Sequence, residues 1–173
     1  TKLIQNTFKE FAPQISIYND HKRMLKNEKP DFVFITTPTF MHIDMAIDCV
    51  EHNCHFFVEK PLSINSSKAK PLIEKLQGKN LITMAGYMMR YIATFCKAKQ
   101  IIDKGIIGDP ITFNAKMYVS QLFKKGNGWR YDKSKSGGGV IITQATHAID
   151  LISWYFGFPN KLNATLLSPY SKN

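Results

Sequence analysis

Several features that quickly assign a function are missing from this sequence. The three cysteines, Cys49, Cys54 and Cys96, form no CxxC pair and share no ligand spacing with histidine, so we expect neither a disulfide nor a metal site. No apolar stretch approaches the ~20 residues that span a bilayer, and the N-terminus does not resemble a signal peptide. These absences predict a soluble, cytoplasmic protein without a membrane partner.

Acidic residues are few relative to basic ones. Asp and Glu total 13 against 23 Lys and Arg, which gives a formal net charge of +10. Such a charge suits a nucleic acid, but the lysines are spread along the chain and no Arg-rich patch interleaved with aromatic residues occurs. We therefore interpret the charge as a solvated basic surface and expect no nucleic-acid partner. A basic module that binds nucleic acid is kept as a rival hypothesis, favoured by the charge alone.

The first half of the chain alternates expected strands and helices. Strands are predicted at 15–18, 31–37, 55–58 and 80–86, and helices at 20–28, 41–53 and 66–78. The apolar run 31–37 is unbroken, which is typical of a parallel strand covered on both faces. The strands recur at the spacing of βαβ units. The sequence therefore predicts a parallel, helix-covered sheet that extends to about residue 86.

Two polar loops follow the second and third of these strands. They read TTPTFMH (36–42) and EKP (59–61). In open parallel sheets, ligands bind beyond the carboxyl ends of the strands. We therefore expect both loops to border a binding site.

The second half has a different character. A helix is predicted at 91–105, closed by Gly105, and residues 111–120 alternate strictly between apolar and polar, as in a half-exposed antiparallel strand. A last helix is predicted from about Val140 to Gly157. One stripe of this helix is apolar and expected to pack on a sheet: Ile141, Ala145, Ile149, Ile152 and Phe156. Another stripe consists of Thr143, His147, Asp150 and Trp154. It carries every titratable group of the helix apart from Tyr155, and it is poorly suited to face solvent.

Taken in order, these segments resemble the Gfo/Idh/MocA family of NAD(P)-dependent oxidoreductases, which includes glucose–fructose oxidoreductase and inositol dehydrogenase. The resemblance runs from about residue 15 to 160, and its motifs are DFVFITTPTFMH, FFVEKPLS, AGYMMRY, IIDKGIIGDP and SGGGVIITQATHAIDLISWYFG. It implies an α/β fold with a partial Rossmann-type parallel sheet, followed by part of an α+β domain with an open antiparallel sheet. Residues 1–86 would be the C-terminal part of the dinucleotide-binding domain, and 87–173 the first part of the substrate and oligomerisation domain.

The resemblance also implies roles for single residues, with NAD or NADP as the cofactor. Lys60 is expected between nicotinamide and substrate, where its ammonium stabilises negative charge on the reacting oxygen. His147 corresponds to the catalytic histidine, which exchanges the hydroxyl proton. The expected cofactor contacts are Thr37, Pro38, His42, Glu59, Lys60 and Arg90. The expected substrate contacts are Gln144, Asp150, Lys60 and Trp129, with Tyr87 and Arg90 also lining the cleft. For Asp150, a role in orienting His147 or capping a neighbour is equally open.

The sequence departs from the family pattern in two ways. It contains no GxGxxG, with which the family opens, so we expect a chain truncated at both ends that is not an efficient enzyme alone. Thr143 and Ala145 stand where many members have Asp and Gly, and the TQATH version is familiar among members that act on other sugars. This departure argues against inositol as the substrate more than it argues against catalytic activity. Glycines 137–139 lack the spacing of a phosphate loop and are expected to allow close packing before the helix.

We therefore predict an NAD(P)-dependent oxidoreductase that acts on a CH–OH group of a sugar, nucleotide-sugar or cyclitol. The alternative is a catalytically silent, dinucleotide-binding sensor or partner-binding protein of the same fold. By analogy with the family, we also expect a homo-oligomer that associates through the sheet of the second domain.

Overall fold

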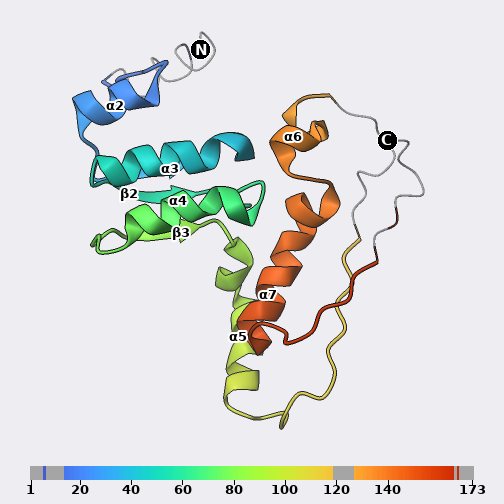
Figure 1. Cartoon of the computed structure of the whole chain (residues 1–173). Coiled ribbons are helices and arrows are strands. Elements are labelled where there is room, and N and C mark those ends of the chain that lie inside the picture. The colour runs from blue at the N-terminus through green and yellow to red at the C-terminus, as the bar shows by residue number, and fades with distance from the viewer. Residues whose placement is uncertain (1–5, 7–13, 119–126, 166, 168–173) are drawn as a thin grey trace.

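The computed structural model describes residues 6, 14–118, 127–165 and 167 (Figure 1). The regular part of the first half is a three-stranded parallel sheet with the strand order β1-β2-β3. The strands are β1 (Phe32–Ile35), β2 (His55–Val58) and β3 (Thr83–Ala85). The predicted parallel sheet is thus confirmed, but the strand predicted at 15–18 is wrong, since these residues belong to no strand. A short β-branched run forms a strand only where a neighbour pairs with it.

Three helices alternate with these strands, as the sequence predicts. They are α2 (His21–Glu28), α3 (His42–Glu51) and α4 (Ser66–Leu76). The side chain of Asp20 caps α2 by accepting from the backbone N–H of Lys22 at 2.9 Å, and Asn65 caps α4 by accepting from that of Lys68 at 2.9 Å. These side-chain oxygens satisfy amide groups that have no partner within the helix, and so fix where each helix begins.

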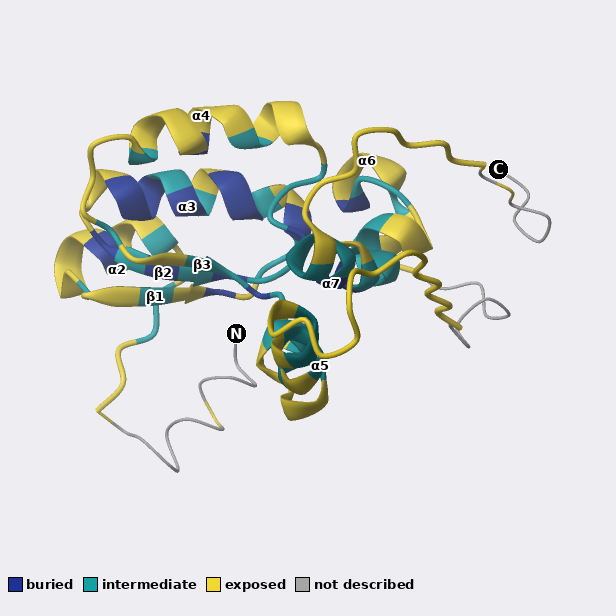
Figure 2. Ribbon diagram, turned by 90° about the horizontal axis from the view of Figure 1, so that it is seen from below, coloured by how far each residue is buried: buried dark blue, intermediate teal, exposed yellow. Residues whose placement is uncertain are grey.

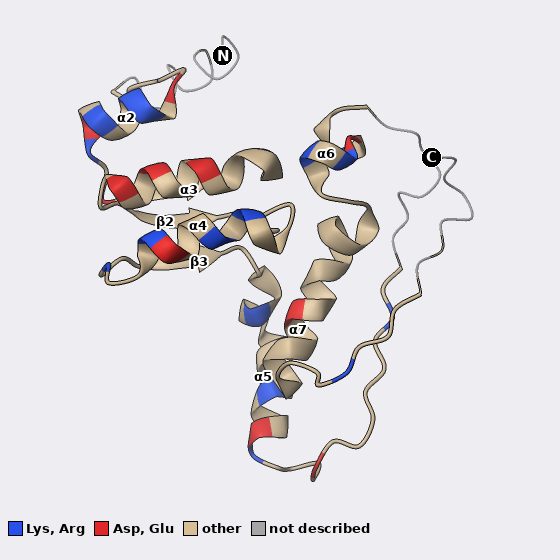
Figure 3. Cartoon of the chain, viewed as in Figure 1, with Lys and Arg blue, Asp and Glu red and all other residues tan. Residues whose placement is uncertain are grey.

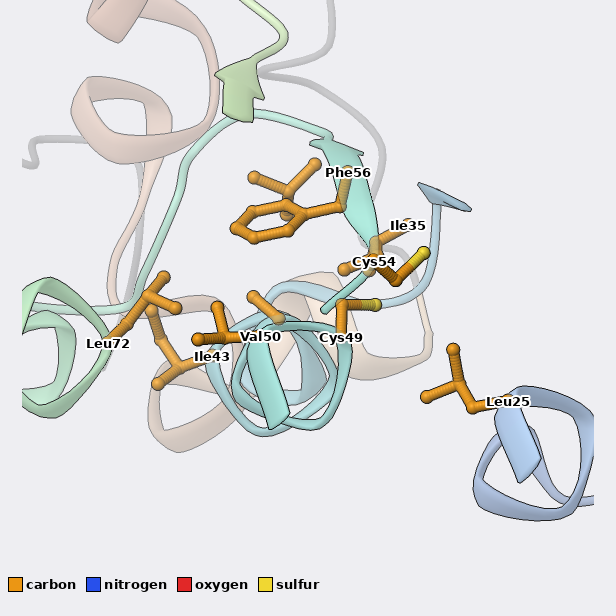
Figure 4. Packing of buried hydrophobic residues seen from close by; sticks show 10 residues of the cluster. Leu25, Ile35, Ile43, Cys49, Val50, Cys54, Phe56 and Leu72 are labelled. Carbon is orange, nitrogen blue, oxygen red and sulfur yellow. The ribbon is translucent and has the colours of Figure 1, made fainter. Parts of the chain in front are cut away.

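Helices α3 and α4 cover the same face of the sheet (Figure 2). On that face, Ile35, Phe56 and Val58 pack against Val50 of α3 and Leu72 of α4 in one buried cluster (Figure 4). The strands alternate, so every second side chain points into this cluster and the rest point away from it.

The opposite face of the sheet is open in the described part of the chain. Phe34 is 68% exposed, and its ring lies 5.6 Å from that of its register partner Phe57. The prediction that strand 31–37 is covered on both faces is therefore wrong here. An unbroken apolar run does not show how many layers pack on a strand, and in the described part of the chain helices cover one face of this sheet.

In the described part of the second half, the regular elements are helices. The longer ones are α5 (Ala93–Asp103) and α7 (Thr146–Phe156), and the short ones are η2 (Met88–Tyr91), η4 (Trp129–Tyr131) and α6 (Lys133–Ser136). A π-helical turn, η5 (Ile141–Ala145), runs directly into α7, so the predicted helix from Val140 to Gly157 is confirmed. The hydroxyl of Tyr155 donates to the carbonyl of Phe95 at 3.0 Å, which joins α7 to α5.

Two predictions for this half are wrong. Residues 111–118 belong to no strand and are exposed, while 119 and 120 lie outside the described residues. The apolar stripe of α7 is also largely exposed, with Ile149 at 53%, whereas His147 and Leu151 are buried. Alternation creates an apolar face, but a strand also needs a partner. Without a second sheet in the described part of the chain, the stripe has no surface to pack on. The antiparallel sheet and its oligomer contact stay predictions.

The surface of the described residues shows mixed charge. Lys and Arg are spread over α2, α4, α5 and α6, Asp and Glu lie beside them on α2, α4 and α5, and α3 carries acidic residues without basic ones (Figure 3). In this part of the chain, no helix is both long and apolar enough to cross a membrane. It also holds no group of three His, Cys, Asp or Glu placed to bind a metal ion, and the three cysteines are free.

Candidate active site

The turn after β2 carries Lys60 to the start of the last helix. The backbone N–H of Lys60 donates to the carboxylate of Glu59 at 3.1 Å, and the Lys60–Pro61 bond is cis. The ammonium Nζ donates to the backbone carbonyl of Thr143 at 2.6 Å. Among the residues that the structure describes, no ion pair joins Glu59 to Lys60. Lys60 therefore bridges the sheet edge and the helical turn just before His147.

His42 holds the two predicted loops together. It is almost completely buried, with Nε2 2.8 Å from the carbonyl oxygen of Thr37 and Nδ1 3.0 Å from that of Pro61. A neutral imidazole has one N–H and donates to one of these carbonyls, whereas the protonated ring donates to both. The loop after β1 and the turn after β2 thus lie side by side.

A cleft of about 680 Å³ opens at the carboxyl ends of β1 and β2. Six residues predicted from the sequence line it: Thr37, His42, Glu59, Lys60, Trp129 and Gln144. Pro38 lies in the same loop as Thr37 but is not part of the lining, and neither are Arg90, His147 and Asp150. The cleft therefore brings together most of the expected cofactor contacts with three of the four expected substrate contacts, Lys60, Trp129 and Gln144.

Arg130 also lines the cleft and was missed by the sequence analysis. Its guanidinium lies 4.8 Å from the centre of the Trp129 ring, within the range of a cation–π contact. Its charge also helps to lower the pKa of Lys60. Arg130 could have been recognised from its position next to Trp129, for which a substrate contact was expected.

Burial and charge change the acidity of Lys60. Burial lowers the pKa of its ammonium below the ordinary value of 10.5, and the charge of Arg130 lowers it further. The carboxylate of Glu59 opposes both effects. Desolvation disfavours a cation, so the neighbouring carboxylate helps to keep Lys60 charged in the cleft.

His147 lies one turn beyond the contact with Lys60. It is 7% exposed, the ring of Tyr87 meets it edge-on at 6.2 Å, and its Nδ1 has no hydrogen-bond partner among the described residues. Burial, and next the charge of Lys60, lower the pKa of His147 below 6.5, while Asp150 and Glu59 oppose this. The ring is therefore neutral near pH 7, as a proton acceptor must be.

Arg90 and Asp150 are joined to each other. Nε of Arg90 donates to Oδ2 of Asp150 at 2.8 Å, and a terminal nitrogen donates to Oδ1 at 2.7 Å. The sequence predicted a cofactor contact for Arg90, and for Asp150 either a substrate contact or a role in orienting His147 or capping a neighbour. The structure brings them together in a bidentate pair beside the cleft.

Close packing at Gly137 fixes the approach of the last helices to the turn after β2. A Cβ on Gly137 would lie 2.5 Å from the carbonyl oxygen of Ile64, and its φ is +79°. We expect Gly137→Ala to lower the free energy of unfolding by about 1–3 kcal/mol, from overpacking and an unfavourable φ. Gly139→Ala is the matched control, because a Cβ there meets no atom within 4 Å. Thermal unfolding of both variants checks this, and equal stabilities would contradict it.

The chain matches two models of one protein family. Residues 5–87 match the model described as "Oxidoreductase family, NAD-binding Rossmann fold", and residues 95–172 match the "GFO/IDH/MocA C-terminal domain".

Curated relatives and solved structures agree with these matches. A levoglucosan dehydrogenase from Pseudarthrobacter phenanthrenivorans is 28% identical over 86% of this chain and 38% of its own length. The scyllo-inositol 2-dehydrogenase (NAD(+)) of Bacillus subtilis is 32% identical over 80% of this chain and 39% of its own. A myo-inositol 2-dehydrogenase structure from Lactobacillus plantarum has a TM-score of 0.69 at 28% identity, covering 87% of this chain and 44% of that one. The chain thus spans less than half the length of each.

Proposed function

Because the chain belongs to the Gfo/Idh/MocA family of oxidoreductases, with an NAD-binding Rossmann fold over residues 5–87, we propose a reaction for the whole protein. It transfers a hydride between a nicotinamide dinucleotide and the CH–OH carbon of a sugar, nucleotide-sugar or cyclitol. The observation that carries the proposal is the bond from Nζ of Lys60 to the carbonyl of Thr143. It joins the end of a cofactor-binding sheet to the helix that holds the proton acceptor.

The residues around the cleft fit the nicotinamide end of such a cofactor. The cleft lies at the carboxyl ends of parallel strands, where this class of sheet binds dinucleotides. Thr37, His42 and Glu59 would hold the cofactor from the sheet side, with Pro38 fixing the loop. When bound there, the nicotinamide ring supplies the hydride acceptor or donor.

Lys60 and His147 then have separate roles at the substrate oxygen. During oxidation, His147 accepts the hydroxyl proton, because burial and Lys60 keep its ring neutral near pH 7. The Lys60 ammonium donates to the same oxygen and stabilises the negative charge that develops there. In the reverse direction, His147 returns the proton. Gln144 and Trp129 would contact the rest of the substrate.

The residues around His147 favour a sugar over an inositol. At position 143, an inositol-type site would have a carboxylate, whereas this chain has the hydroxyl of Thr143. That hydroxyl donates to the carbonyl of Gly139 at 3.1 Å. Relatives of both kinds are similar to the chain, namely levoglucosan and inositol dehydrogenases. We therefore place anhydrosugars and hexoses first among candidate substrates and cyclitols second.

The test is a fluorescence titration of the whole protein with NADH and NADPH, followed by a panel of levoglucosan, hexoses, nucleotide-sugars, myo-inositol and scyllo-inositol. We expect saturable binding of NADH or NADPH, and reduction of the corresponding oxidised form, NAD+ or NADP+, with at least one sugar of the panel. If the folded protein binds neither dinucleotide, the oxidoreductase proposal is wrong. If it binds one but turns over no member of the panel, the catalytically silent sensor becomes the better interpretation.

A further inference from the structure

The ion pair between Arg90 and Asp150 joins the segment just after β3 to the last helix, α7. Arg90 belongs to η2, just after β3, and Asp150 lies on α7, one turn after His147. The Asp150 side chain is only 11% exposed, and each of its oxygens accepts from the guanidinium. A planar, bidentate pair of this kind is stronger and more directional than a single contact.

Further contacts support the same junction. The hydroxyls of Tyr87 and Thr146 lie 3.1 Å apart, and the Tyr87 ring meets His147 edge-on. The Arg90 guanidinium also lies 5.7 Å from the centre of the Trp154 ring, one turn beyond Asp150. The segment 87–90 therefore contacts α7 on both sides of His147.

This arrangement leaves little of the Asp150 side chain for a ligand. Both carboxylate oxygens of Asp150 are engaged, and neither residue lines the cleft. We infer that Arg90 and Asp150 are positioning residues, which lock α7 onto the segment after β3 and thereby set the place and the charge environment of His147. The inference rests on the proposed function, because it assigns His147 the exchange of a proton with the substrate.

The charged groups around His147 make the inference testable. Lys60 and burial lower the pKa of His147, whereas Asp150, from its own helix, and Glu59, from the turn after β2, raise it. Arg90, from η2, offsets the charge of Asp150 through the ion pair. Removing Asp150 and removing Arg90 thus break the same pair but change the charge near His147 in opposite directions.

The experiment compares Asp150→Asn and Arg90→Gln in the whole protein. We expect both to lower kcat for sugar oxidation by roughly 10- to 100-fold, the cost of a misplaced catalytic group. The acid limb of the pH profile of kcat/KM should move to lower pH in Asp150→Asn and to higher pH in Arg90→Gln. Arg90→Lys keeps the charge and should leave the limb at the wild-type pH. Glu51→Gln, which breaks the exposed pair of Glu51 with Lys75, is the control and should change neither quantity.

A pH titration of the His147 ring by NMR in the same variants separates the two proposals. If the protein turns over no sugar, the proposed function fails, and the ring titration still tests the positioning pair. Shifts in opposite directions support the inference. Shifts in the same direction, or none, would overturn it, because a purely structural pair predicts the same result for either partner. If Arg90→Gln does not fold, Asp150→Asn and Arg90→Lys test the inference instead: the pKa of the His147 ring should fall in Asp150→Asn and stay at the wild-type value in Arg90→Lys, and an equal change in both would overturn it.

Discussion

Replacing Lys60 with methionine is expected to lower kcat for sugar oxidation by about 100- to 1,000-fold, the usual effect of removing one preorganised donor to a developing oxyanion. Methionine keeps the apolar stem but removes the ammonium that bonds to Thr143 and, in our proposal, to the reacting oxygen. NADH binding should persist, because Thr37, His42 and Glu59 remain. Steady-state kinetics beside a fluorescence titration measure both quantities.

The control for this variant is Lys70→Met, on the exposed surface of α4. It removes the same charge from the protein as a whole and should leave kcat unchanged.

In the wild-type protein, Lys60 should also give the pH profile of kcat an alkaline limb. Because burial lowers its pKa below 10.5, the cation is lost as the pH rises through that lower value, and activity falls with it. Full activity of Lys60→Met would remove Lys60 from the mechanism.

Local sequence signals predicted the first half of the fold well. The strands around 33, 56 and 84 and the helices capped by Asp20 and Asn65 depend on short-range chemistry: apolar runs, side-chain caps and βαβ spacing. The open face at Phe34 was not predictable in this way. Whether an apolar residue is covered depends on which distant segments pack against it, and the strand itself contains no information about that.

The second half shows the same limit more strongly. Residues 111–118 alternate as a strand should, yet they are not in a strand, because pairing is a property of two segments and the pattern describes one. The helix from 140 to 157 was predicted from its own apolar and terminal residues. Which of its stripes is buried depended on segment 87–90, more than fifty residues away, which contacts the side that carries His147 and Asp150.

The candidate site was predictable as a set of residues but not as a set of contacts. The motifs located Lys60, His42 and His147, and the structure brings the first two to one cleft. Motifs assign each residue a ligand, whereas in the folded chain Arg90 and Asp150 bind one another and His42 binds two backbone carbonyls. Such pairings join residues up to sixty positions apart, so no local pattern contains them.

Replacing His147 with asparagine is expected to lower kcat/KM for oxidation by about 100- to 10,000-fold, the range for loss of a general base. The wild-type rate should fall as the pH drops through the pKa of His147, since only the neutral ring accepts a proton. Burial and Lys60 lower this pKa, so the limb should lie below pH 6.5. In His147→Asn, the pH profile of the small remaining kcat/KM should have no acid limb.

Two further variants separate this role from a general effect on the fold. His52→Asn removes an exposed histidine at the end of α3 and should leave both the rate and the acid limb unchanged. Lys60→Met should move the limb of its residual activity to higher pH, because it removes a charge that lowers the pKa of His147. A limb that stays in place in Lys60→Met and persists in His147→Asn would assign the proton transfer to another group. If it moves in Lys60→Met and disappears in His147→Asn, the limb belongs to His147 and the charge of Lys60 sets its pKa, so the two side chains act together on the proton of the reacting hydroxyl.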